Sequence, residues 1–352
     1  MVIKRILSTA VIAVTLTLAN AQLKKISGIN YSMRKGADWL PHPNKCKSTE
    51  EITLDLDVLK TVTDNIRLYS VGDCDCGSVV IPIARRAGLK VAVGLWVDSN
   101  NATFIKEKET LETLMANGII TSSNVVSILV SSEALYRNEI SLEMGIKYLN
   151  QIKELRDRHN LQAIPLSIAD IGDIYIQYPQ IIDHVDFCAI NAFPYWEDKD
   201  IKEAASRFKS RIQGLIVPCT KGGNVKITIS ETGWPTDGRS EKVTIAVASH
   251  VNARRYFDEF TSLAEMEGWN YYYFEAFDSA WKLEQVGESH VEGYFGLFDG
   301  NRKLKEAYLD SILSPGQSST PGTLRESAST TSSMPAQGTS PTTQPLPLHS
   351  RC

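Results

Sequence analysis

The regular alternation of two kinds of segment is the feature that most limits how this chain can fold. Short apolar runs rich in β-branched residues recur, separated by stretches with apolar residues at three- and four-residue spacing. The first pattern is typical of buried strands and the second of amphipathic helices. We predict strands within eight segments: 25–32, 65–70, 89–97, 124–133, 162–170, 185–193, 225–231 and 271–277.

Helical spacing is clearest in four of the intervening stretches, two of which end at a glycine. We expect helices within 53–63, 79–88, 142–159 and 252–268, with Gly88 and Gly268 at helix C-caps. Continuous apolar strands that alternate with helices form parallel sheets. Eight such units predict an α/β fold, a (β/α)8 TIM barrel in a single domain over residues 22–313. An open doubly wound sheet is the alternative, but no GxGxxG loop follows the first run.

Both ends of the chain differ from this body. Residues 1–21 combine a basic start, an apolar core and a small-x-small site, which is typical of a secretory signal peptide. A membrane anchor is the alternative, but the apolar stretch is short and no later segment is apolar enough to span a bilayer. Residues 314–352 are rich in Ser, Thr and Pro, which predicts a disordered tail. We therefore expect a secreted protein, extracellular or associated with a cell wall.

Charge and metal-ligand spacing exclude several classes of partner. The net charge is −4 and no basic stripe with interleaved aromatic residues is present, so we do not expect nucleic-acid binding. The six histidines lack HExxH or similar spacing, and we expect no metal and no cofactor. We also expect a monomer.

Export makes disulfides and glycosylation possible. Five of the six cysteines lie in the body, so at least one thiol there is free or pairs with Cys352. Their connectivity stays open, although Cys74 and Cys76 are too close together to pair with each other. Asn101 begins an Asn-Ala-Thr glycosylation acceptor, which we place in a polar loop.

Two apolar runs end in a Ser-Glu pair. Glu133 follows "NVVSILVSS" and Glu231 follows "VKITIS". A single glutamate at such a position is more often a cap or a surface ion pair. In a TIM barrel, however, the carboxyl ends of the strands meet at one mouth and carry the chemistry. Two glutamates in this position therefore predict an acid/base and a nucleophile for glycoside hydrolysis, which needs two carboxylates flanking one bond.

The surroundings of the two glutamates suit a sugar-binding cleft. Aromatic rings stack on the apolar faces of pyranoses. We expect such residues at the strand ends, whereas Tyr272 and Phe274 are expected in the core. Arg67 could hold a carboxylate ionised or form a structural ion pair, and Asn191 could donate to a sugar or to a carboxylate. The candidate aromatic residues are Tyr31, Tyr69, Trp96, Tyr136, Phe193, Tyr195, Trp196, Trp234, Phe277 and Trp281.

The motifs "RLYS", "SEALYRN", "AINAFPYW", "ISETGWPT", "FEAFDSAWK" and "GYFGLFD" together resemble glycoside hydrolase family 17. The resemblance is closest to fungal-type cell-wall β-1,3-glucanases and glucanosyltransferases. It implies a TIM barrel, retaining chemistry, Glu133 as acid/base, Glu231 as nucleophile and a β-1,3-glucan substrate. Lys282 and Glu292 match supporting positions of the family, and Ser132 fits its pattern. Two residues depart from it: Ser131 stands where the family usually has Gly, and Ser279 where it commonly has an acidic residue.

Three functions are consistent with these residues. The main hypothesis is a secreted retaining endo-β-1,3-glucanase that hydrolyses cell-wall glucan. A β-1,3-glucanosyltransferase would use the same intermediate but pass it to a sugar hydroxyl. A non-catalytic glucan-binding wall protein would be indicated by loss of either glutamate, and both are present.

Overall fold

The computed structural model describes residues 25–219, 226–287 and 289–313. The predicted signal peptide at 1–21 and the predicted tail at 314–352, with Cys352, lie outside these residues. Among the described residues no helix is both long and apolar enough to cross a bilayer.

Eight parallel strands close into a barrel in chain order, β1-β2-β3-β4-β5-β6-β7-β8, which confirms the predicted (β/α)8 fold. Each predicted run overlaps one strand, and β5, β7 and β8 extend one residue beyond their runs. Their bounds are β1 Ile29–Asn30, β2 Asn65–Arg67, β3 Lys90–Leu95, β4 Val125–Ser132, β5 Leu166–Ile171, β6 Phe187–Asn191, β7 Lys226–Thr232 and β8 Asn270–Tyr273.

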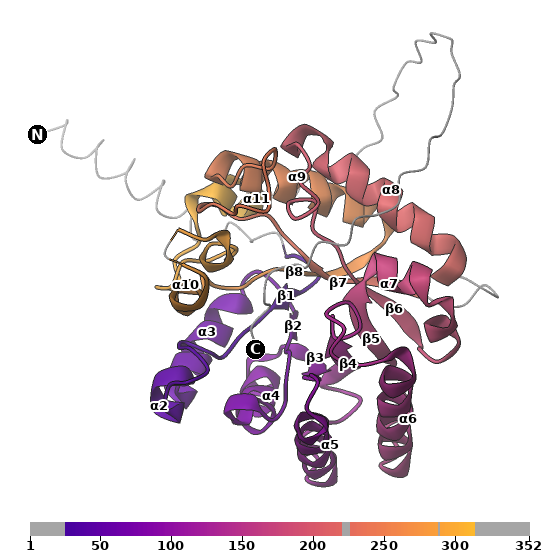
Figure 1. Ribbon diagram of the computed structural model, residues 1–352. Coiled ribbons are helices and arrows are strands. Elements are labelled where there is room, and N and C mark those ends of the chain that lie inside the picture. The colour runs from indigo at the N-terminus through magenta and orange to yellow at the C-terminus, as the bar shows by residue number, and fades with distance from the viewer. Residues whose placement is uncertain (1–24, 220–225, 288, 314–352) are drawn as a thin grey trace, which may run out of the picture.

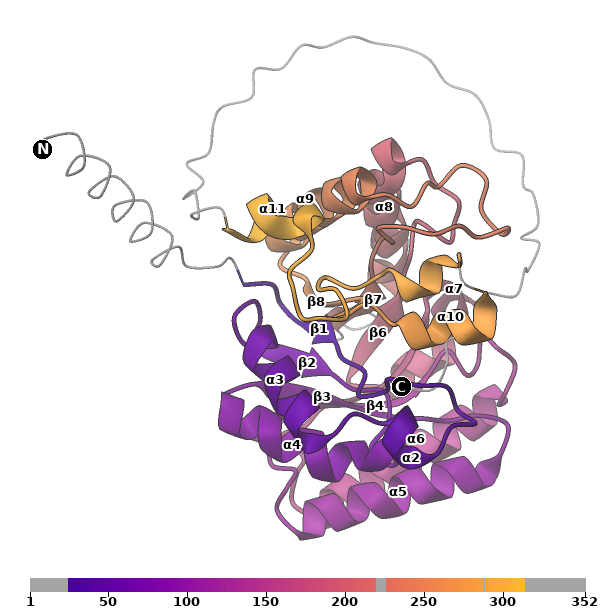
Figure 2. The ribbon, with the colours of Figure 1, turned by 90° about the vertical axis from the view of Figure 1, so that its left-hand side faces the viewer.

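The helices surround the barrel, with α3 to α6 along one half and α8, α9 and α11 along the other (Figures 1 and 2). Their apolar faces pack on the strands, so the core is a ring between the helices and the barrel. The bounds are α2 His42–Lys45, α3 Thr49–Leu59, α4 Cys76–Ala87, α5 Asn101–Ala116, α6 Leu142–Arg158, α7 Gly172–Gln177, α8 Ile201–Cys219, α9 His250–Glu267, α10 Ala280–Val286 and α11 Leu309–Leu313.

Local signals explain where several helices begin and end. Gly88 and Gly268 follow α4 and α9 in the left-handed conformation, as predicted for C-caps.

The predicted polar loop at Asn101 is wrong, because this residue begins α5. The Asn100 side chain accepts a hydrogen bond from the amide of Ala102 and so caps the helix. Asn101 remains exposed, and its Oδ1 accepts a hydrogen bond from the hydroxyl of Tyr148.

Two disulfides join parts of the body, Cys46–Cys74 and Cys188–Cys219. Among the described cysteines Cys76 is free, and it is buried. The first bridge ties the loop after β1 to the segment after β2, so it stiffens the carboxyl end of the barrel.

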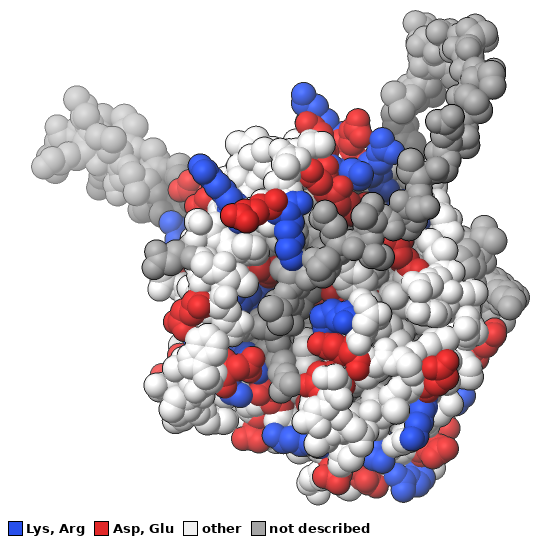
Figure 3. All heavy atoms as spheres, viewed as in Figure 1, with Lys and Arg blue, Asp and Glu red and all other residues white. Residues whose placement is uncertain are grey.

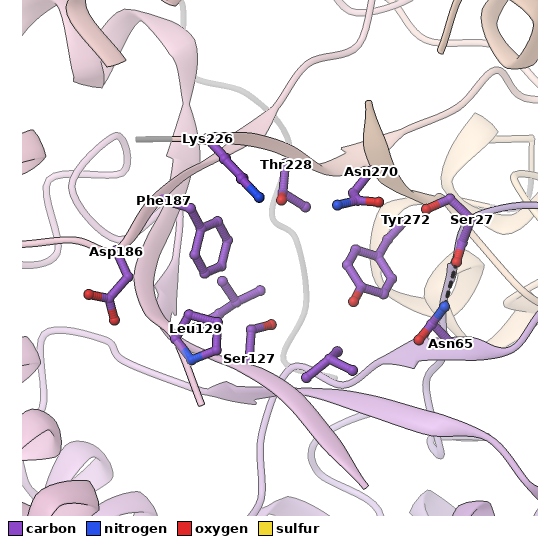
Figure 4. A pocket seen from close by; sticks show the side chains of 12 residues that line it. Ser27, Asn65, Ser127, Leu129, Asp186, Phe187, Lys226, Thr228, Asn270 and Tyr272 are labelled. Carbon is purple, nitrogen blue, oxygen red and sulfur yellow. Dashed lines mark hydrogen bonds between the residues drawn. The ribbon is translucent and has the colours of Figure 1, made fainter. Parts of the chain in front are cut away.

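The amino end of the barrel is open. A cavity of about 450 Å³ lies there, lined by residues at or near the starts of several strands. Phe187 and Tyr272 point into it from opposite sides (Figure 4). On the face shown in Figure 3, acidic and basic side chains are interspersed and form no single-sign patch.

Candidate active site

Glu133 and Glu231 both lie at the carboxyl end of the barrel. Glu133 directly follows β4, and Glu231 is the penultimate residue of β7. Near each glutamate the strand register shifts: between Leu129 and Ser132 on β4, and between Ile229 and Thr232 on β7. A bulge of this kind inserts an extra residue and re-aims the side chains that follow it.

The amide of Asn191, at the end of β6, joins the two carboxyl groups. Its Nδ2 donates to Oε1 of Glu133 at 2.8 Å and to Oε1 of Glu231 at 3.0 Å. Since one nitrogen reaches both, these two oxygens are at most about 6 Å apart, which suits the roughly 5–5.5 Å separation of the carboxyl groups in retaining glycosidases. Both glutamates are almost fully buried, at 2% and 1% exposure.

Glu231 is held by a cation and a hydroxyl. The Nη1 of Arg67 lies 2.6 Å from Glu231 Oε1, and Ser132 donates to the same oxygen at 3.1 Å. Burial lowers the pKa of Arg67, but the Glu231 carboxylate, with smaller contributions from Tyr69 and Tyr272, raises it overall. Arg67 also donates to Asn30, and its guanidinium lies over the ring of Tyr69. These contacts favour an ionised Glu231 in one orientation.

The hydroxyl of Tyr69 is a neutral donor beside this group. Burial, and then the Glu231 charge, raise the pKa of Tyr69 well above its usual value. Among the described residues its Oη has no hydrogen-bond partner, as is also true of the indole nitrogens of Trp96, Trp196 and Trp281. Buried polar groups normally have a partner, so these atoms are available to sugar hydroxyls or water.

A second charged cluster follows β8. Lys282 Nζ donates to Glu275 Oε1 at 2.9 Å and lies 3.7 Å from Glu292 Oε2. Burial raises the pKa of Glu275, and Lys282 lowers it only in part; a hydrogen bond from Ser279 also acts to lower it. The departure at Ser279 therefore places a neutral donor, instead of a further acid, against a buried carboxyl.

The aromatic candidates fall into two groups. Tyr136 and Trp196 are half-buried, and the ring of Trp196 stacks on His290. Tyr31, Tyr195 and Trp281 are buried, and the hydroxyl of Tyr31 donates to Asp55. The expected core positions of Tyr272 and Phe274 are confirmed.

The prediction that Trp234 offers its face to a sugar is wrong. Its side chain is fully buried, and its indole nitrogen donates to the carbonyl of Val247. The ring packs against Tyr195 and Tyr256. A place near a strand end can be read from the sequence, but it does not show what covers the ring in three dimensions.

Sequence reasoning missed several polar residues of the site. Asp170 is wholly buried at the end of β5, next to the turn that carries Glu133. Ser230 donates to Asn191, and Glu275 anchors the Lys282 cluster. Asp170 could have been found, because it ends an apolar run just as Glu133 does.

The family description BtgE/BtgC glycoside hydrolase domain matches residues 28–296. This chain belongs to that family. It is therefore a glycoside hydrolase, and its carboxylate pair lies within the matched region.

Relatives of this glycoside hydrolase include glucan 1,3-beta-glucosidases of two yeasts. That of Saccharomyces cerevisiae is 30% identical over 273 residues, which cover 74% of this chain and 85% of the yeast protein. That of Candida albicans is 31% identical over 271 residues, with 74% and 86% coverage. Among solved structures, a glycoside hydrolase family 17 beta-1,3-glucanosyltransferase from Rhizomucor miehei matches with a TM-score of 0.68 and 29% identity, covering 80% of this chain and 96% of that one. The resemblance to family 17 is thus confirmed.

Proposed function

We propose that this protein is a retaining endo-β-1,3-glucanase that hydrolyses cell-wall β-1,3-glucan. The observation that carries the proposal is the single Asn191 amide bonded to both Glu133 and Glu231. It supports a separation suited to direct attack on the sugar, because an inverting site needs room for a water between carboxyl and sugar. The names of the relatives support the β-1,3-glucan substrate.

In the first step Glu231 attacks the anomeric carbon while Glu133 donates its proton to the departing glycosidic oxygen. A glycosyl ester forms on Glu231 and the C–O bond to the leaving chain breaks. The cation of Arg67 keeps Glu231 ionised before attack. In the second step Glu133 removes a proton from water, the water oxygen attacks the anomeric carbon, and the ester bond breaks. The second displacement restores both carboxyl groups and the original anomeric configuration.

A glucanosyltransferase is the second candidate, because the Rhizomucor miehei enzyme of this family is one. A sugar hydroxyl would then replace water in the second step. Half-buried Tyr136 and Trp196 are suitable surfaces for such an acceptor. A purely glucan-binding role has less support, since both carboxylates are present and the Asn191 amide donates a hydrogen bond to each.

Product analysis on defined β-1,3-glucan oligomers tests the proposal. We expect shorter oligomers whose new reducing ends are initially of the β anomer. Products longer than the substrate would instead indicate transfer. An α anomer at early times would contradict retention, and absence of cleavage would contradict the enzymatic role.

The setting of this activity is also part of the proposal. A signal peptide at 1–21, a catalytic domain at 22–313 and a tail at 314–352 suit a secreted or wall-associated monomer. Glycosylation of Asn101 is compatible with its exposure. Size-exclusion chromatography of the secreted protein, with and without deglycosylation, would check both expectations.

A further inference from the structure

We propose that Asp170 is a positioning residue for the acid/base glutamate, holding the turn that carries Glu133. This inference rests on the proposed function, because it concerns how efficiently Glu133 protonates the leaving group. Asp170 lies on β5, beside β4, and is completely buried.

The backbone around Glu133 needs an external support. Glu133 itself has φ +57°, a left-handed conformation that is unfavourable for a residue with a Cβ. Its amide donates to the carbonyl of Ala169, the residue before Asp170, at 2.9 Å. Its carbonyl accepts from the amide of Arg137, which closes a turn over residues 133–137 just after β4.

The carboxylate of Asp170 supplies that support. Its Oδ2 accepts from the amide of Leu135 at 3.2 Å, inside the turn, and its Oδ1 accepts from the amide of Ile171 at 2.8 Å. One side chain thus connects the end of β5 to the residues just after Glu133. Without it, a buried amide of the turn loses its acceptor, which makes the turn free to shift.

The groups around Asp170 act on its charge in opposite directions, so replacing its side chain should disturb the turn that carries Glu133. Burial, followed by the charge of Glu133, raises the pKa of Asp170 well above its usual value. Hydrogen bonds from the amides of Ile171 and Tyr136, and the charge of Arg137, act in the opposite direction. The geometry therefore places a second carboxyl group behind the acid/base, joined to it through backbone.

Two substrates separate positioning from folding. Cleavage of a β-1,3-glucan oligomer needs the acid, whereas an activated dinitrophenyl β-glycoside of the same sugar does not, because its leaving group departs without a proton. For Asp170→Asn, which keeps one acceptor oxygen for two backbone amides, we expect kcat/KM on the oligomer to fall about 10- to 100-fold, since small misplacements cost this much. We expect kcat/KM on the activated glycoside, which reports only the ester-forming step, to fall less than about 3-fold, as the nucleophile is untouched.

Asp198→Asn is the matched control. Asp198 also accepts backbone amides across a loop, those of Thr244, Ile245 and Ala246. We expect this variant to lower both rates equally or not at all. Glu133→Ala provides the reference for complete loss of the acid.

Each outcome decides the proposal. Equal loss on both substrates, or full activity on the oligomer, would overturn the role of Asp170. If Asp170→Asn does not fold, Asp170→Ser, which keeps a shorter acceptor, must show the same selective loss. A wild-type protein that cleaves the activated glycoside but no glucan would overturn the proposed substrate as well, whereas a normal wild type with an unselective variant would overturn only the positioning role.

Discussion

At the scale of single residues, the two glutamates have different roles in the reaction, so replacing each one should change the rates in a different way. Glu231→Ala removes the nucleophile, so we expect the rates on every substrate to fall by several orders of magnitude. Glu133→Ala should affect poor leaving groups most, and azide should partly restore turnover of an activated glycoside by attacking the glycosyl ester. Initial rates with and without azide measure this difference. Full glucanase activity in Glu133→Ala would refute the acid assignment.

Ser131 offers a second prediction at this scale. It has φ +74° and lies in the register shift of β4, and its buried hydroxyl has no hydrogen-bond partner among the described residues. A left-handed residue within a bulge is a position that favours glycine, which accounts for the glycine usual in the family. We expect Ser131→Gly to raise the free energy of unfolding by about 1 kcal/mol.

Ser127→Gly is the control for this stability measurement. Ser127 lies on the same strand with a negative φ, so glycine there should lower the free energy of unfolding by about 0.5–1 kcal/mol. Denaturant unfolding of both variants would check the pair. A loss of stability in Ser131→Gly as large as that in Ser127→Gly would contradict the strain at Ser131.

At the scale of elements, the bridge between the loop after β1 and the segment after β2 should contribute measurably. Cys46 and Cys74 are 28 residues apart, and a loop of this length is worth roughly 3–4 kcal/mol by the chain-entropy estimate. We expect the double variant Cys46→Ala, Cys74→Ala to lose stability of that order in denaturant unfolding. Cys76→Ala, which leaves the bridge intact, should cost less.

The elements also show what a sequence can and cannot predict. All eight strands and the glycine caps at Gly88 and Gly268 were predictable, because apolar runs and left-handed glycines are local signals. The start of α5 was misjudged, since an Asn-Ala-Thr sequence resembles a loop unless Asn100 is recognised as its cap. The bulges on β4 and β7 were not predictable, because they depend on the pairing of neighbouring strands.

The candidate site was predictable in its two glutamates but not in their connections. A strand-end position can be read from the sequence, whereas the bond from Asn191 to both carboxyl groups depends on the barrel closing. The burial of Trp234 has the same origin, since Tyr195 and Tyr256 come from distant segments. Asp170 was overlooked although its position at a strand end matches that of Glu133.

At the scale of the whole molecule, buried acids make stability depend on pH. Burial raises the pKa of Asp278 to about 6 despite the opposing charge of Lys305, and burial raises that of Glu107 to about 7. The folded state therefore holds protons that the unfolded chain has released, and stability falls as pH rises from about 4 to about 7. For Asp73 the balance is reversed: burial raises its pKa, but the hydrogen bonds and charges of Arg34 and Lys45 together outweigh burial and lower it.

The two effects together predict a maximum in stability. Because groups such as Asp73 lose their contribution as pH falls below about 4, the midpoint of thermal unfolding should be highest at about pH 4. Thermal unfolding from pH 3 to 8 would show this maximum. Asp278→Asn should make the decline above pH 5 shallower, and a midpoint that keeps rising to pH 8 would contradict the prediction.

The amide that joins Glu133 to Glu231 is also a point at which one small chemical change would disable the site. Hydrolysis of the Asn191 side chain would exchange its donor nitrogen for an oxygen of nearly the same size. Three carboxyl groups would then lie together, those of Glu133, Glu231 and the new acid at position 191. The added negative charge or proton would remove the hydrogen bonds that hold the first two in place. Such a sample would lose its activity, and the additional buried acid would also lower its midpoint of thermal unfolding.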